Sequence, residues 1–321
     1  MSCIKVSAPG SLMLTGEHAV LHGSPAAACA VDKRIYLTLT PRADRAVHIE
    51  SPLGNLDTTL DNLPQQGQFT FIVEAIRQVR LNTGIDIKTE SEFSSTVGLG
   101  SSAAVTVCIC MALNTLKGII PKREELFNQC YNVVHGVQKT GSGCDLAASI
   151  YGGIIAMESK DGEYTPRKLD CPSLPEIDLY YCGYKMKTPE VIALVNKKAQ
   201  TEPEKYAKLY QYMTQVAGST VTVLERGNFE LAGNLFGKYQ MLMEQLGVCD
   251  DTLKDMVTKL QSDAGVLGAK ISGSGLGDCV LSLGIPQKKL EGSRACRIVH
   301  RRGQARSSRR RCTRRRLRCR G

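Results

Sequence analysis

Residues 97–105 read Val-Gly-Leu-Gly-Ser-Ser-Ala-Ala-Val, and this stretch decides how the rest of the chain is interpreted. The two glycines let the backbone turn closely around a ligand, and the serine pair marks the start of an apolar helix. The first N–H groups of a helix have no partner within it and carry positive dipole charge, so they can bind an anion such as phosphate. The stretch lacks the Lys of the G-x-x-x-x-G-K-[ST] loop and the spacing of the dinucleotide fingerprint. A turn that only starts a helix is the alternative interpretation.

Two further segments are rich in glycine. Residues 7–23 read Ser-Ala-Pro-Gly-Ser-Leu-Met-Leu-Thr-Gly-Glu-His-Ala-Val-Leu-His-Gly and follow the start of a short apolar strand at 4–8. Residues 269–279 read Ala-Lys-Ile-Ser-Gly-Ser-Gly-Leu-Gly-Asp-Cys and precede the apolar run 280–283. A turn with this many glycines can bring bare backbone against a ligand or a neighbouring loop.

In this order, the three segments resemble the GHMP kinase family, named for galacto-, homoserine, mevalonate and phosphomevalonate kinases. The resemblance covers residues 4–284, and the Gly-Glu-His-Ala-Val-Leu-His-Gly of residues 16–23 looks most like mevalonate kinases. It implies an α+β fold of two domains with the site in the cleft between them. The N-terminal domain, at 1–165, would be ribosomal S5 domain 2-like, and the C-terminal domain, at 166–293, would be ferredoxin-like.

Hydrophobic periodicity also favours an α+β architecture, because strands and helices alternate without strict βαβ order. The expected strands cover residues 4–8, 34–41, 85–93, 154–157 and 177–184, and two more lie near residues 268 and 279. The expected helices cover residues 71–81, 101–116, 121–137, 146–151, 204–224, 228–246 and 251–262, with one more capped by Thr188. A charged, proline-bearing stretch at 158–175 is the expected linker.

The excess positive charge of the chain lies at one end. Of the 41 Lys and Arg residues, 13 are arginines within 294–321, which holds no acidic residue. The rest of the chain has 28 basic against 31 acidic residues, which is ordinary for a soluble enzyme. The segment 294–321 has little apolar content and no periodicity, so we expect disorder. Aromatic residues do not interleave with its arginines, so we favour an aberrant, frame-shifted end over a nucleic-acid-binding arm.

Composition indicates a globular, cytoplasmic protein. No stretch approaches the roughly 20 apolar residues of a membrane span, and the N-terminus lacks a signal-peptide pattern. The 13 cysteines show no paired metal-ligand spacing, so we interpret most of them as apolar filler in a reducing compartment. The expected partner is a small-molecule substrate, with no membrane involved, and a homodimer is left open.

Phosphoryl transfer needs a held γ-phosphate, cations that neutralise its charge, and an aligned acceptor hydroxyl whose proton a carboxylate can take. The resemblance implies ATP and Mg²⁺ as cofactors, with Asp145 as the catalytic base and Ser102 as a ligand of the metal. A plain helix N-terminus is the alternative for each of these two residues. The implied phosphate-binding set is Gly98, Leu99, Gly100, Ser101, Ser102, Ala103, Gly273, Ser274 and Gly275. The implied acceptor-binding set is Ser11, Glu17, His18 and Thr188.

The chain departs from the family pattern at two places. Mevalonate kinases usually have Lys where this chain has Ser11, and a serine cannot supply positive charge to the catalytic carboxylate. The family's metal-binding Glu also has no clear counterpart between residues 128 and 136. Lys185 and Lys187 are candidates for the missing cation. We interpret Asp278 as a turn residue rather than a ligand.

These observations leave several functions open. The first is ATP-dependent phosphorylation of the mevalonate hydroxyl to 5-phosphomevalonate in isoprenoid biosynthesis. The second is phosphomevalonate kinase activity, because the segments around residues 143 and 275 are similar to those enzymes. The third is a catalytically silent relative that binds nucleotide or sugar. Nucleic-acid binding through 294–321 would instead predict salt-sensitive affinity that is lost when this segment is deleted.

Overall fold

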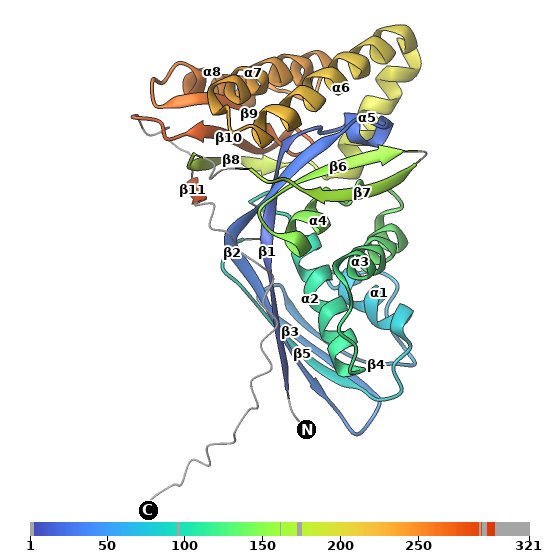
Figure 1. Cartoon of the computed structure of the whole chain (residues 1–321). Helices are drawn as coiled ribbons and strands as arrows, with labels where there is room; N and C mark the ends of the chain where they lie inside the picture. Colours follow the sequence, from blue (N-terminus) through green and yellow to red (C-terminus); the bar gives the residue numbers. More distant parts are fainter. Residues whose placement is uncertain are drawn as a thin grey trace, which may run out of the picture.

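The structure, a computed structural model, consists of two β-sheets with helices packed against each (Figure 1). It describes residues 3–94, 97–160, 162–171, 175–288 and 290, and the backbone of 294–298. The first sheet has seven strands in the order β4-β3-β5-β2-β6-β7, with β1 paired to β2, and the second has four in the order β11-β8-β10-β9. This is the two-domain α+β architecture that the sequence predicts.

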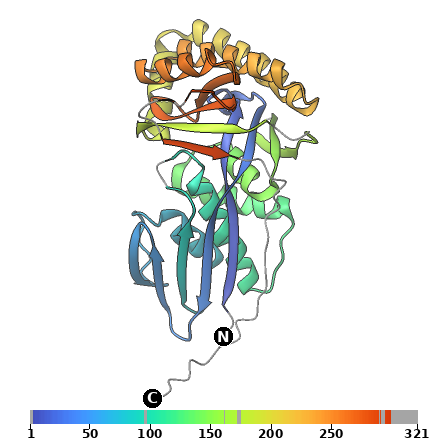
Figure 2. The same cartoon turned by 90° about the vertical axis from the view of Figure 1, so that its left-hand side faces the viewer.

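The first sheet is built around two long antiparallel strands, β1 (Ile4–Thr15) and β2 (Ala26–Pro41), which run through the length of the molecule (Figure 2). Its other strands are β3 (Ala46–Ser51), β4 (Gly54–Thr59), β5 (Ile85–Ser91), β6 (Ile154–Lys160) and β7 (Glu163–Lys168). Helices α1 (Thr70–Val79), α2 (Ser101–Leu116), α3 (Arg123–Gln138) and α4 (Cys144–Tyr151) cover one face of this sheet (Figure 1).

The second sheet comprises β8 (Ile177–Lys185), β9 (Val266–Ser272), β10 (Gly277–Gly284) and β11 (Arg294–Ile298). Its helices are α5 (Thr188–Thr201), α6 (Pro203–Glu225), α7 (Phe229–Leu246) and α8 (Asp251–Gln261). Helices α7 and α8 pack against β9. A short 3₁₀ helix at Ala19–His22 follows β1 and contacts α6.

The apolar start of β2 joins the two halves. Side chains alternate between the faces of a strand, so Ala26 and Ala28 face α1–α4 while Ala27 and Cys29 face the second half. Both faces are buried, which explains why this part of the strand is continuously apolar. The cluster on the second face also includes Phe236 of α7.

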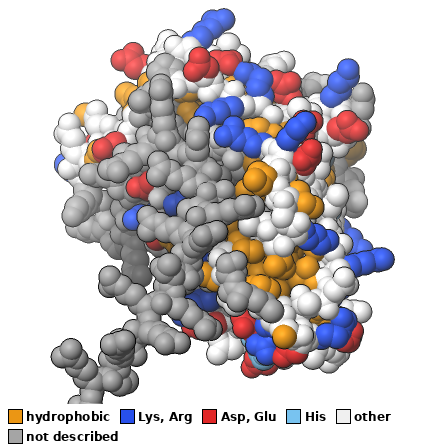
Figure 3. Space-filling view, turned by 60° about the horizontal axis from the view of Figure 1, so that its bottom comes forward, with side chains coloured by type: hydrophobic (Ala, Val, Ile, Leu, Met, Phe, Trp, Pro, Cys, Tyr) orange, Lys and Arg blue, Asp and Glu red, His pale blue; other side chains and the backbone are white. Residues whose placement is uncertain are grey.

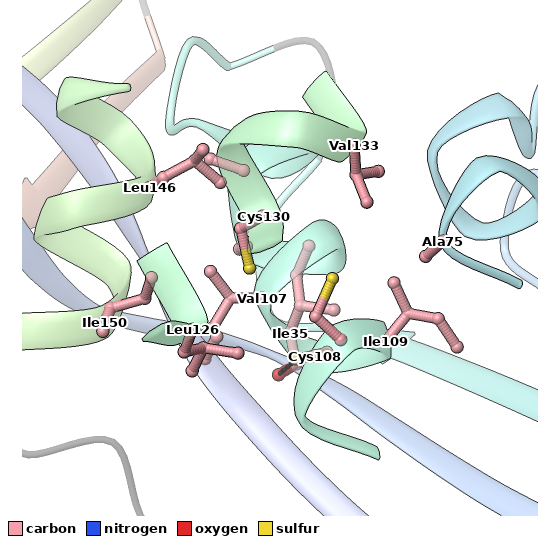
Figure 4. Packing of buried hydrophobic residues seen from close by; sticks show 14 of the residues in the cluster. Ile35, Ala75, Val107, Cys108, Ile109, Leu126, Cys130, Val133, Leu146 and Ile150 are labelled. Atoms are coloured by element: carbon pink, nitrogen blue, oxygen red, sulfur yellow. Dashed lines mark hydrogen bonds between the residues drawn. The ribbon is translucent and has the colours of Figure 1, made fainter. Parts of the chain in front are cut away.

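Most cysteines within the described residues act as apolar filler. Cys108 of α2 lies against β2, where its thiol donates to the Ile35 carbonyl, and Cys130 of α3 lies against α2; both are buried among aliphatic side chains (Figure 4). Burial raises the pKa of the Cys108 thiol to about 12, which keeps it protonated and unreactive.

Several predictions about elements were wrong. The hairpin of β3 and β4 was not predicted, and the expected linker at 158–175 contains the end of β6 and all of β7. Strand β7 belongs to the first sheet and ends at Lys168. Strand β1 continues past residue 8 to Thr15, because a bulge between Pro9 and Ser11 accommodates the proline without ending the pairing with β2.

The expected disorder of 294–321 does not extend to its first five residues. Residues 294–298 form β11, which pairs with β8 at the edge of the second sheet. Backbone pairing with an exposed strand edge needs no hydrophobic pattern, so periodicity could not reveal it. The rest of this prediction, at 299–321, lies outside the described residues.

The described surface and helices add two observations. On the face seen in Figure 3, basic side chains lie among acidic ones rather than in one large patch. Among the described helices, none combines the length and apolarity needed to cross a bilayer.

Candidate active site

A cavity of about 540 Å³ lies where the two halves meet. Its wall comes from the start of α2, the start of α4, the segment after β1, the β8–α5 junction and the turn between β9 and β10. These elements are far apart in the chain, and the two central strands bring them together. Of the predicted site residues, the cavity is lined by Glu17, His18, Gly98, Leu99, Gly100, Ser101, Ser102, Ala103, Asp145, Thr188, Gly273 and Ser274.

The glycine-serine stretch forms a tight turn against β1. Gly100 adopts φ +61°, and a Cβ there would lie 2.1 Å from the Ser11 hydroxyl oxygen, so a larger residue does not fit. The Ser11 N–H donates to the Leu99 carbonyl at 3.1 Å, which fixes the turn. Helix α2 then begins at Ser101, with Gly100 rather than a serine as its N-cap. The N–H groups of its first turn are therefore available to an anion in the cavity.

Asp145 is the second residue of α4 and is held by a hydroxyl from β1. The Ser11 Oγ donates a hydrogen bond to its Oδ1 at 2.8 Å, and Ser149 of the same helix donates to the Pro9 carbonyl at 2.9 Å. Burial raises the pKa of Asp145 above its usual value, while the Ser11 hydrogen bond and the charge of Lys185 oppose the rise. Ser11 does not line the cavity, so it acts on Asp145 from behind.

Asp278 faces the site, although the sequence indicated only a turn residue. It has φ +72° at the start of β10, and its Oδ2 pairs with the Lys185 Nζ at 2.6 Å. The side chain of Asp278 is 6% exposed and its Oδ1 has no hydrogen-bond partner among the described residues. A non-glycine residue held in this backbone region is strained, and such strain is often found at functional sites.

Glu17 and His18 lie in the cavity wall but are tied to the second half. Lys270 of β9, fully buried, donates a hydrogen bond to Glu17 Oε1, and the Tyr239 hydroxyl donates to the Glu17 carbonyl at 2.8 Å. His18 donates from Nε2 to the Ser274 carbonyl at 2.8 Å. Burial lowers the pKa of His18, which favours the neutral ring. Lys270 was missed, and its only sequence signal was one charge in an otherwise apolar strand.

The structure places the three remaining predicted residues, Thr188, Gly275 and Lys187, differently with respect to the cavity. Thr188 is the first residue of α5 rather than its cap, and it accepts a long hydrogen bond from the Ser274 hydroxyl at 3.5 Å. Gly275 does not line the cavity. A Cβ at Gly275 would lie 2.3 Å from the Val248 carbonyl oxygen, so this glycine permits close packing against the segment between α7 and α8. Lys187, the second candidate cation, does line the cavity.

Comparison with known proteins identifies the family of the chain. The family model "GHMP kinases N terminal domain" matches residues 69–153, and "GHMP kinases C terminal" matches residues 220–304. The mevalonate kinase of Thermococcus gammatolerans is 31% identical, with 92% of this chain and 93% of the relative covered.

Two solved structures are similar in fold. L. major mevalonate kinase, solved in complex with R-mevalonate, has a TM-score of 0.78 at 21% identity, covering 94% of this chain and 97% of that one. Lactococcus lactis galactokinase, solved with galactose, has a TM-score of 0.79 at 16% identity and covers 95% of each chain. The backbone alone therefore does not distinguish acceptors. The two matched family models and the full-length relative establish that the chain is a small-molecule kinase and belongs to the GHMP kinase family.

Proposed function

We propose that the chain transfers the γ-phosphoryl group of ATP to the primary hydroxyl of mevalonate. The observation that carries the proposal is that the first turn of α2 and the Asp145 carboxylate line one cavity. An anion-binding helix start beside a potential base is what phosphoryl transfer to a hydroxyl requires. The choice of acceptor follows the curated relatives, of which three, at 30% or 31% identity, are named mevalonate kinase.

In this proposal the triphosphate binds to the backbone amides of residues 98–103, and Gly273 and Ser274 approach it from the second half. The glycines allow close contact between phosphate and backbone. Glu17, His18 and Thr188, which line the same cavity, are assigned to the acceptor.

The site also fits Mg²⁺. The described residues contain no cluster of three or more His, Cys, Asp or Glu side chains that could enclose a metal ion. Mg²⁺ in kinases does not need such a cage, because it takes most of its ligands from phosphates and water. The Ser102 hydroxyl is a hard oxygen ligand on the cavity wall, so we assign it to the metal. The cation, when bound, neutralises phosphate charge.

Asp145 would accept the proton of the acceptor hydroxyl as that oxygen attacks the γ-phosphorus. The new O–P bond forms while the bond between the γ-phosphorus and the β–γ bridging oxygen breaks, and ADP leaves with the electron pair. Ser11 orients the carboxylate through its hydrogen bond to Oδ1. The neutral His18 can hydrogen-bond the acceptor without adding charge.

A coupled ADP-release assay with mevalonate, phosphomevalonate and galactose tests the proposal. We expect the highest kcat/KM for mevalonate and loss of that turnover in Asp145→Asn, with nucleotide still bound. If the protein clearly preferred phosphomevalonate or galactose, that compound would be the acceptor instead of mevalonate. Turnover with none of the three, in a folded protein that binds ATP, would favour the silent relative.

A further inference from the structure

Three carboxylates line the cavity, and within the described part of the chain only two of them form an ion pair with a lysine. Glu17, Asp145 and Asp278 all line it. The ammonium group of Lys270 is taken up by Glu17, away from the cavity. Asp145 is held by a neutral hydroxyl, so its negative charge is not offset by a direct ion pair among the described residues. A site that must also receive a triphosphate therefore needs further positive charge.

The Asp278 carboxylate is held tightly between two glycine turns. A Cβ at Gly98 would lie 2.3 Å from Asp278 Oδ1, and one at Gly273 would lie 3.3 Å from Oδ2. The carboxylate thus occupies the space that side chains at these positions would fill. Its position is defined by backbone on both sides, so it can fix the position of whatever it binds.

Lys185 is what Asp278 binds. It is the last residue of β8 and is paired in register with Gly277, directly before Asp278. The short ion pair takes one carboxylate oxygen, and 32% of the lysine side chain remains exposed at the cavity. An ammonium group that is anchored but still accessible can serve a ligand that enters the cavity.

Lys185 and Asp145 line the same cavity. The charged groups that face Asp145 are Lys185 from β8, Asp278 from β10 and Glu17 from the segment after β1. Lys185 lowers the pKa of Asp145, whereas the two carboxylates raise it. Lys185 is therefore the charge that favours the ionised, proton-accepting form of the base.

We propose that Lys185, anchored by Asp278, is the cation of this reaction centre and offers positive charge both to the Asp145 carboxylate and to the transferred phosphoryl group. The proposal rests on the proposed kinase function. Lys185 of β8 then supplies the positive charge that Ser11 cannot supply, and Asp278 is a positioning residue for Lys185.

The decisive variant is Lys185→Met, compared with Lys185→Arg. We expect Lys185→Met to lower kcat about 100-fold, the loss typical when one charge-stabilising group is removed. We also expect the acid limb of kcat/KM to move to higher pH, because one opposite charge near Asp145 is gone. Lys185→Arg should keep the acid limb in place. Nucleotide affinity, measured by calorimetry, should change less than kcat does.

Two comparisons isolate the effect. Lys205→Met also breaks an ion pair, with Glu202, but on the surface of α6, and we expect parent activity. Lys187→Met removes equal charge from the same cavity wall, and we expect a smaller shift of the acid limb than in Lys185→Met. Asp278→Asn should lower kcat, because Lys185 then loses the carboxylate that holds it in place. Circular dichroism verifies that this variant is folded.

A carboxyl ¹³C NMR titration of Asp145 separates this proposal from the kinase function itself. Its midpoint should rise in Lys185→Met whether or not an acceptor has been found. An unmoved midpoint, or a larger effect from Lys187→Met, would overturn the role of Lys185. Absence of turnover in the parent protein would overturn the proposed kinase function but not the role of Lys185.

Discussion

The buried pair of Lys270 and Glu17 gives a sharp test of how the two halves are joined. Lys270 is 0% exposed and the Glu17 side chain 2% exposed, so both charges are largely shielded from bulk water. Breaking such a pair from one side costs about 3–5 kcal/mol, because the remaining charge stays buried and uncompensated. Glu17→Gln and Lys270→Met should each lower the free energy of unfolding by about this amount.

The double variant Glu17→Gln with Lys270→Met should behave differently. Both charges are then absent and the volumes are nearly kept, so stability should return to within about 2 kcal/mol of the parent. The two changes are therefore expected to be strongly non-additive. Kinase activity should not return with stability, because Glu17 also lines the cavity.

Urea unfolding followed by circular dichroism measures these free energies, and the midpoint and slope of each transition should be compared. The control is Lys205→Met on the surface of α6, where the partners are 56% and 50% exposed. An exposed pair of this kind contributes below about 1 kcal/mol. If the double variant lost as much stability as the two single variants combined, the pair would not be the cause, and lost packing around Tyr239 would explain the effect instead.

Three further predictions concern the reaction centre. Asp145→Asn should lower kcat by about 10²–10⁴-fold in the ADP-release assay. The pKa of Asp145 is raised in the folded protein, so its ionisation lowers the free energy of unfolding once the pH exceeds the pKa of an ordinary aspartate. Asp145→Asn should therefore unfold at a higher urea concentration than the parent at pH 7 but not at pH 3. Ser11→Ala removes a hydrogen bond that lowers the pKa of Asp145, so the acid limb of kcat/KM should move to higher pH; an unchanged limb would contradict this. Gly100→Ala places a methyl group 2.1 Å from the Ser11 oxygen at φ +61°, and calorimetry should show weaker ATP binding, with loss of at least about 1 kcal/mol of stability.

The sequence predicted the local parts of this molecule well. Helix α2 begins at Ser101 and ends at Leu116 as expected, and α7 differs from its prediction by one residue at its start. Such elements depend on periodicity and on residues at helix ends, which lie close together in the chain. Strands β3, β4 and β11 were missed because short strands are stabilised by their neighbours more than by their own pattern. Strands β4 and β11 also lie at the edges of their sheets, where they pair on one side only.

The sequence alone determined which stretches bear the chemistry, since glycine turns and helix starts are written in consecutive residues. Only the tertiary structure decided how the charges in the cavity are partnered. Lys270 meets Glu17 across 253 positions, and Ser11 meets Asp145 across 134. An ion pair or a shifted pKa depends on distance and burial, and neither is defined until β1, β8, β9 and β10 converge on one cavity.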